Sequence, residues 1–212
     1  ISAVHFPNPQ AKYTILYSHG SAEDLGGILW VLREIRDGGF AVFAYDYQGY
    51  GTSQGKPSED NTYRDIEASY NYLTQQLGVP AKQIIVYGRS VGGGPAIDLA
   101  SRQTVGGLVV ESSFVSAFRV LTKIPILPFD KFVNIDKIGK VKAPVLVIHG
   151  KLDRIVSFWH GEQLFAAAKQ PKFNFWVDGA DHNDLMTVAG DRYSETLRNF
   201  AKLVDESSLP KL

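Results

Sequence analysis

The sequence has no cysteine among its 212 residues and only one methionine. Without cysteine, disulfide bonds, thiol catalysis and thiolate metal sites are excluded within it. Its 22 basic and 22 acidic residues cancel, which argues against a nucleic-acid-binding protein or one held by charge on anionic lipid. No apolar run approaches the about 20 residues that cross a bilayer, and no signal peptide is visible at the start. We therefore expect a cytoplasmic protein.

A metal site and a phosphate-binding loop are also missing from the sequence pattern. The histidines do not show the short mutual spacings of metal ligands; the four considered are His19, His149, His160 and His182. The glycine run at 92–94 lacks the Lys-Ser/Thr ending of a phosphate-binding loop. We expect neither a metal nor a cofactor.

Short apolar, β-branched runs alternate with amphipathic segments along most of the chain. The runs expected as strands are 1–6, 13–17, 40–45, 83–87, 107–111, 144–148 and 173–177. The segments expected as helices are 26–36, 58–77, 157–169 and 191–204, and a further helix begins near residue 93. With 44% hydrophobic residues, the chain is expected to form one domain over 1–212, an α/β fold whose mainly parallel sheet has helices on both faces.

The most informative motif is Gly-Arg-Ser-Val-Gly at residues 88–92. It lies between an expected strand and an expected helix, where a tight turn forces the serine into an unusual backbone conformation and projects its hydroxyl above the sheet. The flanking glycines suit a turn that is too sharp for side chains. The motif predicts that Ser90 is a nucleophile; the alternative is that Ser90 merely caps the following helix.

An acid and a histidine follow in the order expected of this kind of site. Asp153 and His182 each lie a few residues beyond an expected strand, and in a parallel sheet such ends share one edge. His182 is expected to take the proton of Ser90 as the serine attacks a carbonyl carbon, and Asp153 to orient the imidazole. Three other acids compete for the role of Asp153, namely Asp178, Asp181 and Asp184.

Attack on a carbonyl also requires N–H donors for the developing oxyanion. The backbone N–H of Val91 directly follows the nucleophile. The second donor is assigned to the backbone of Ser21, in the loop that follows the expected strand 13–17.

The segment 112–142 breaks the alternation of strands and helices. It is rich in apolar residues, and its prolines predict short pieces rather than one helix. It is either a small apolar lid over the site or ordinary packing. The candidates for a substrate pocket are His19, Tyr47, Tyr50, Phe114 and Leu127, each with a structural role as the alternative.

Several motifs together resemble one known superfamily over nearly the whole chain. They occupy residues 18–20, 24–26, 45–47, 49–51, 55–59, 87–92, 134–138, 144–150, 160–161 and 179–184. The chain resembles the α/β-hydrolases, and more narrowly the α/β-hydrolase-domain group of protein depalmitoylases and related bacterial esterases. The resemblance implies the α/β-hydrolase fold and the same triad of Ser90, Asp153 and His182. The group's membrane members carry an acylated N-terminal cysteine cluster, which is absent here, so membrane association would depend on residues upstream of those given.

These observations predict a serine hydrolase that cleaves carboxylic ester or thioester bonds through an acyl-enzyme on Ser90. The expected partner is a small-molecule or acyl-protein substrate. Two alternatives are kept: a serine peptidase of the prolyl-oligopeptidase type, and a catalytically idle binding module on a hydrolase fold.

Overall fold

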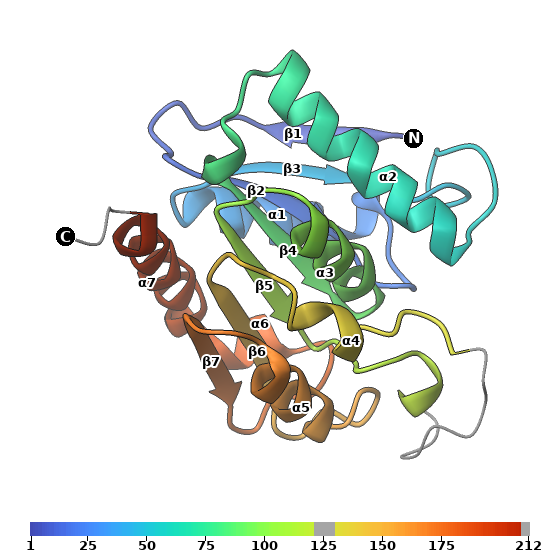
Figure 1. Ribbon diagram of the computed structural model, residues 1–212, viewed down its shortest axis with the longest axis vertical. Coiled ribbons are helices and arrows are strands. Elements are labelled where there is room, and N and C mark those ends of the chain that lie inside the picture. Colours follow the sequence, from blue (N-terminus) through green and yellow to red (C-terminus); the bar gives the residue numbers. More distant parts are fainter. Residues whose placement is uncertain (121–129, 209–212) are drawn as a thin grey trace.

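Seven strands form a single sheet at the centre of the computed structural model, which describes residues 1–120 and 130–208 (Figure 1). The strands are β1 Ala3–Phe6, β2 Thr14–Ser18, β3 Ala41–Tyr45, β4 Ile84–Arg89, β5 Gly107–Glu111, β6 Val145–Gly150 and β7 Lys172–Val177. Their order across the sheet is β1-β3-β2-β4-β5-β6-β7. Only β1 runs antiparallel to its neighbour, and the other pairs are parallel. The mainly parallel α/β fold predicted from the alternation is confirmed.

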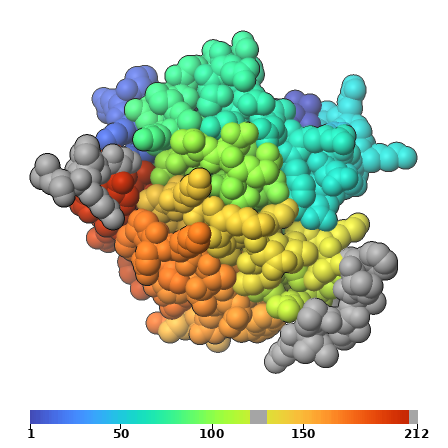
Figure 2. Space-filling model, viewed as in Figure 1, coloured from blue at the N-terminus to red at the C-terminus, as the bar shows by residue number. Residues whose placement is uncertain are grey.

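Helices cover both faces of this sheet. They are α1 Leu25–Asp37, α2 Glu59–Asn71, α3 Gly93–Arg102, α4 Ile135–Ile138, α5 Trp159–Ala167, α6 Leu185–Ala189 and α7 Asp191–Ser208. The front face in Figure 1 carries α2, α3, α4 and α5, and these helices form much of the surface seen in the space-filling view (Figure 2). The opposite face packs against α1, α6 and α7.

The central strands are buried on both faces, because neighbouring residues along a strand point to opposite sides of the sheet. On β2, Leu16 joins the apolar core beneath α2 and α3, whereas Ile15 and Tyr17 join the core beneath α1 and α7. This is why the strands read as continuous apolar runs in the sequence.

Helix ends follow the sequence signals closely. Asp24 caps α1 by accepting a hydrogen bond from the Gly27 N–H at 2.8 Å, and Ser58 caps α2 through the Asn61 N–H at 3.1 Å. The predicted helix 58–77 is α-helical only to residue 71, and residues 72–76 form a wider π-helical turn.

The segment 112–142 is folded into short pieces where the structure describes it, as its prolines predict. A 3-10 turn spans Phe118–Val120, and α4 follows further along. The predicted pocket residue Leu127 lies outside the described residues. Within the described part of the chain, no helix has both the length and the apolar character that crossing a membrane requires.

Candidate active site

The turn after β4 holds Ser90 in a left-handed backbone conformation, with a φ of 52°. A non-glycine residue adopts this conformation at a cost, and such strain is concentrated at functional sites. Both glycines of the motif are sterically required. A Cβ on Gly88 would lie 2.3 Å from the Gly92 carbonyl oxygen, and one on Gly92 would lie 2.1 Å from the Ser18 carbonyl oxygen. The turn therefore fits tightly between its own strand and neighbouring β2.

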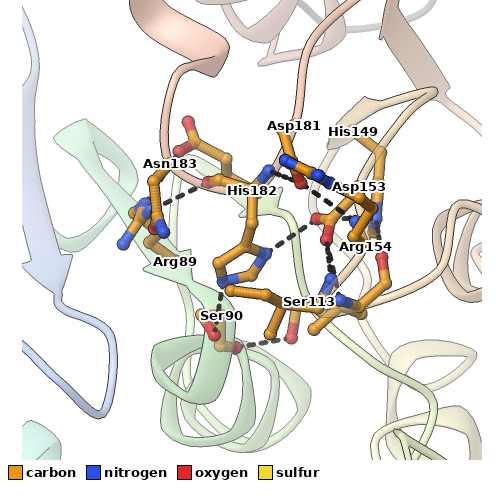
Figure 3. A network of polar contacts seen from close by, with 12 residues as sticks. Arg89, Ser90, Ser113, His149, Asp153, Arg154, Asp181, His182 and Asn183 are labelled. Atoms are coloured by element: carbon orange, nitrogen blue, oxygen red, sulfur yellow. Dashed lines mark hydrogen bonds and ion pairs between the residues drawn. The ribbon is translucent and has the colours of Figure 1, made fainter.

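Three side chains from three strand ends form a continuous chain of contacts (Figure 3). The Nε2 atom of His182 lies 3.2 Å from the Ser90 Oγ, and its Nδ1 atom lies 2.7 Å from the Asp153 Oδ2. Ser90, Asp153 and His182 are 9%, 6% and 5% exposed. When Nδ1 carries the ring proton and donates a hydrogen bond to the carboxylate, Nε2 is left as the acceptor for the serine hydroxyl. This is the arrangement that nucleophilic activation of a serine requires.

The loop after β6 keeps Asp153 in its carboxylate form. Its Oδ1 accepts hydrogen bonds from the backbone N–H groups of Ile155 and Val156 at 3.0 and 2.7 Å. Burial opposes the charge, but hydrogen bonds from His149 and His182 and the N–H of Val156 outweigh it and lower the pKa of Asp153 well below its ordinary value. The acid partner is therefore ionised at neutral pH.

The three competing acids bind other groups. Asp181 accepts the backbone N–H groups of Arg154 and His182 at 2.9 and 2.8 Å and pairs with the Arg154 side chain. Asp184 accepts the Asp181 N–H at 2.7 Å. Asp178 pairs with Lys151 at 2.8 Å. Asp181 and Asp184 thus fold the loop that carries the imidazole, while Asp153 is the acid that contacts the ring.

Arg89 connects the turn that carries Ser90 to the loops on both sides of it. Its guanidinium donates to the His182 carbonyl oxygen and to the Asn183 Oδ1, both at 2.9 Å (Figure 3). It also forms ion pairs with Glu23 and with Glu111, the latter at 3.3 Å. Sequence reasoning assigned no role to this residue, although a charged side chain inside the motif at the end of a buried strand is a usable signal.

Glu111 is held from the far side by two tyrosines. The hydroxyl groups of Tyr87 and Tyr193 both donate hydrogen bonds to its Oε2, that of Tyr193 at 2.6 Å. Burial, and then the charge of Glu111, raise the pKa of both tyrosines well above the ordinary value. They remain hydrogen-bond donors, so Glu111 forms a fixed anchor for Arg89.

The loop after β2 lies directly beside the turn that carries Ser90, because Ser18 pairs with Gly88 in the sheet. Glu23 folds this loop back by accepting the Gly20 N–H at 2.6 Å. Ser21, which follows Gly20, is exposed. The structure thus brings the predicted oxyanion donors Ser21 and Val91 onto adjacent strand ends, and their role stays a prediction.

Two of the predicted pocket residues are buried instead of lining a pocket. His19 is 0% exposed, with its Nδ1 atom 2.8 Å from the Gly20 carbonyl oxygen and its Nε2 atom 3.3 Å from the Asp46 Oδ1. Tyr47 is 1% exposed and donates its hydroxyl proton to the His19 carbonyl oxygen at 2.7 Å. Both hold the loop after β2 from within, so the pocket prediction is wrong for His19 and Tyr47.

The remaining pocket candidates lie on two sides of the site. Tyr50 lines a cavity of about 530 Å³ beside His182. Phe114 is buried in a small apolar cluster with Phe132 and Val156. No group of three or more metal-ligating side chains gathers anywhere in residues 1–120 or 130–208.

Comparison with known proteins relates this chain to hydrolases. The family model described as "Serine aminopeptidase, S33" matches residues 9–129, more than half of the chain. Alpha/beta hydrolase domain-containing protein 17B from Xenopus tropicalis and from Homo sapiens are each 42% identical over 197 residues, which are 91% of this chain and 67% of those proteins. The chain thus spans about two thirds of their length.

Solved structures share the fold at low sequence identity. The monoacylglycerol lipase of Paleococcus ferrophilus has a TM-score of 0.74 at 18% identity, covering 96% of this chain and 98% of that one. The esterase Pf2001 of Pyrococcus furiosus has a TM-score of 0.77 at 20% identity, covering 91% and 82%. These similarities concern the fold.

Proposed function

This chain belongs to the serine aminopeptidase S33 family and is a hydrolase of the α/β fold, and from that premise we propose that it cleaves carboxylic ester or thioester bonds through an acyl-enzyme on Ser90. The observation that carries the proposal is the chain of contacts from Ser90 through His182 to Asp153.

The reaction follows from the protons that these groups hold. His182 accepts the hydroxyl proton as the Ser90 Oγ attacks the carbonyl carbon, and Asp153 stabilises the imidazolium that forms. The N–H groups of Val91 and Ser21 receive the negative charge on the carbonyl oxygen. His182 then donates its proton to the departing alcohol or thiol. Water then attacks the acyl carbon while His182 accepts its proton; His182 returns a proton to the Ser90 Oγ as the bond to the acyl group breaks, and the carboxylic acid leaves.

The direct test combines covalent labelling with turnover. A fluorophosphonate probe should label Ser90 in the folded protein, and p-nitrophenyl esters of increasing acyl length should be hydrolysed. Ser90→Ala should lose both properties. Ser101→Ala, a matched change on α3 away from the turn, is the control that should retain them. An unlabelled wild-type protein would instead favour the idle binding module.

The family description supports a second candidate, an aminopeptidase. The same triad can cleave an amide bond, because His182 can protonate an amine leaving group. Aminoacyl p-nitroanilides compared with p-nitrophenyl esters decide between the two. Turnover of the anilides at a kcat/KM equal to or above that of the esters would assign the chain to peptide substrates.

A further inference from the structure

The cavity of about 530 Å³ beside His182 is bounded by four segments of the chain. These are the loop after β2, the N-terminal half of α1, the turn at residues 49–51 and the segment that carries His182, and the ends of β2, β4 and β5 close the cavity with Tyr17, Arg89 and Glu111. Both Ser21 and His182 line it. In the proposed reaction these two residues face the carbonyl oxygen and the leaving group, so the cavity opens where one part of the substrate must lie.

The position of His182 identifies which part of the substrate that is. His182 protonates the leaving group, so the leaving-group atom faces the imidazole. The cavity includes Tyr17 and Arg89, which lie on the α1 side of the sheet. The apolar cluster around Phe114 lies on the other side, where Val91 and Tyr63 of α2 pack against it. Ser90 thus stands between this apolar cluster and the cavity.

Charge in the cavity is unfavourable for anions. Its walls carry three carboxylates, from Glu23, Asp24 and Glu111, against the one guanidinium of Arg89. That guanidinium already contacts two of these carboxylates and two further oxygen atoms. At the N-terminus of α1, Asp24 occupies the Gly27 N–H. An entering anion meets net negative walls and donors that are already engaged.

Apolar and aromatic side chains form a further part of the lining, beside the polar Ser21 and Asn183. These side chains include Ile28, Trp30, Val31, Tyr50, Leu185 and Met186. Trp30 is 53% exposed, which is unusual for a tryptophan and leaves its indole ring available to a ligand. Aromatic rings beside carboxylates bind alkylammonium groups through cation–π contacts, and bind neutral alkyl groups by burial.

We propose that this cavity binds the leaving-group side of the substrate and selects a neutral or positively charged apolar group over a polyanionic carrier such as coenzyme A. The proposal rests on the proposed hydrolase function. It makes Trp30 and Asp24 specificity-determining residues that act on the departing alcohol or thiol and not on the acyl chain.

The test uses three thioesters with one shared acyl group and leaving groups of different charge: butyrylthiocholine, S-butyryl-2-mercaptoethanol and butyryl-coenzyme A. We expect kcat/KM for the first two to exceed that for the coenzyme A ester by at least about tenfold at low salt, with a smaller gap at high salt. Equal or reversed rates would overturn the proposal while leaving the hydrolase function intact. Hydrolysis of none of the three, with no labelling of Ser90, would remove both.

Two variants locate the effect in the cavity. Asp24→Asn retains the helix cap and removes one charge, and it should lower the ratio of thiocholine to coenzyme A turnover by about two- to fivefold. Trp30→Ala should raise KM for the thiocholine ester without slowing deacylation, which no longer involves the leaving group. Asp37→Asn, about 20 Å away at the other end of the same helix, and Tyr72→Ala, beyond the far end of α2, are the matched controls. Ratios unchanged in both cavity variants would refute the assignment.

Discussion

Replacing Ser90 by glycine should stabilise the protein relative to replacing it by alanine, although both changes abolish the proposed nucleophile. The φ of 52° at Ser90 is a left-handed conformation in which a side chain crowds the backbone. Glycine has no Cβ and adopts this conformation without that crowding. Both variants lose the contact between the hydroxyl and His182 equally, so the comparison isolates the backbone strain.

The expected magnitude follows from two opposing terms. Relief of a left-handed conformation is worth about 1–2 kcal/mol. Glycine also gains freedom in the unfolded chain, which costs about 0.5–1 kcal/mol relative to alanine. We therefore expect Ser90→Gly to be more stable than Ser90→Ala by about 0.5–1 kcal/mol.

Ser101 on α3 provides a reference position with ordinary helical backbone. There the first term is absent, and Ser101→Gly should be less stable than Ser101→Ala by about 0.5–1 kcal/mol. Subtracting the glycine–alanine stability difference at position 101 from that at position 90 removes the unfolded-state term. What is left, about 1–2 kcal/mol, is the backbone strain at position 90.

Urea and thermal denaturation of the four variants measure this difference. For a chain of this length, 1 kcal/mol shifts Tm by about 2–4 °C. The sign of the difference between glycine and alanine should reverse between positions 90 and 101. If glycine is the less stable residue at both positions, the turn is not strained and the reasoning fails.

Other predictions follow from the same contacts. Gly92→Ala should destabilise the fold by about 3 kcal/mol or more in urea denaturation, because its Cβ would meet the Ser18 carbonyl oxygen at 2.1 Å. Asp153→Asn should lower kcat on the order of 10⁴-fold in an ester assay, and the variant should stay folded. Arg89→Lys keeps the charge but not the fork of donors, so kcat should fall about 100-fold with little change in KM. Burial, and then the charge of a neighbouring histidine, lower the pKa of His160 from 6.5 to about 4, so stability should be full above pH 6.5 and fall between pH 6.5 and 4, a loss that His160→Gln should reduce.

Local patterns in the sequence were sufficient to predict the sheet and to select the contacting side chains. Ser90, Asp153 and His182 each follow a buried strand, and parallel strands bring such ends to one edge. The structure indeed places the three in contact. The choice of Asp153 over the nearer Asp181 rested on the same topology, because a residue from the neighbouring strand end reaches the Nδ1 side of the ring.

Features that depend on three-dimensional packing were not predictable in this way. His19 and Tyr47 resemble pocket residues because they follow strands, yet their loops turn inward and bury them. The ion-pair partners of Arg89 could not be predicted either, because Glu23 and Glu111 lie far from it along the chain and no periodicity relates them. The end of α2 in a π-helical turn also has no distinct sequence signature.

The adjacency of Arg89 and Ser90 has a mechanical consequence. Arg89, the last residue of β4, directs its side chain to the α1 side of the sheet, and Ser90 begins the turn that follows the strand end. Because Arg89 holds the carbonyl oxygen of His182 and also Glu23, which folds the loop after β2, a shift of the turn moves the His182 loop and the loop after β2 along with it. A partly buried ion pair is a weak source of net stability. Its value here is geometric: it couples the two loops to the serine on which they are proposed to act.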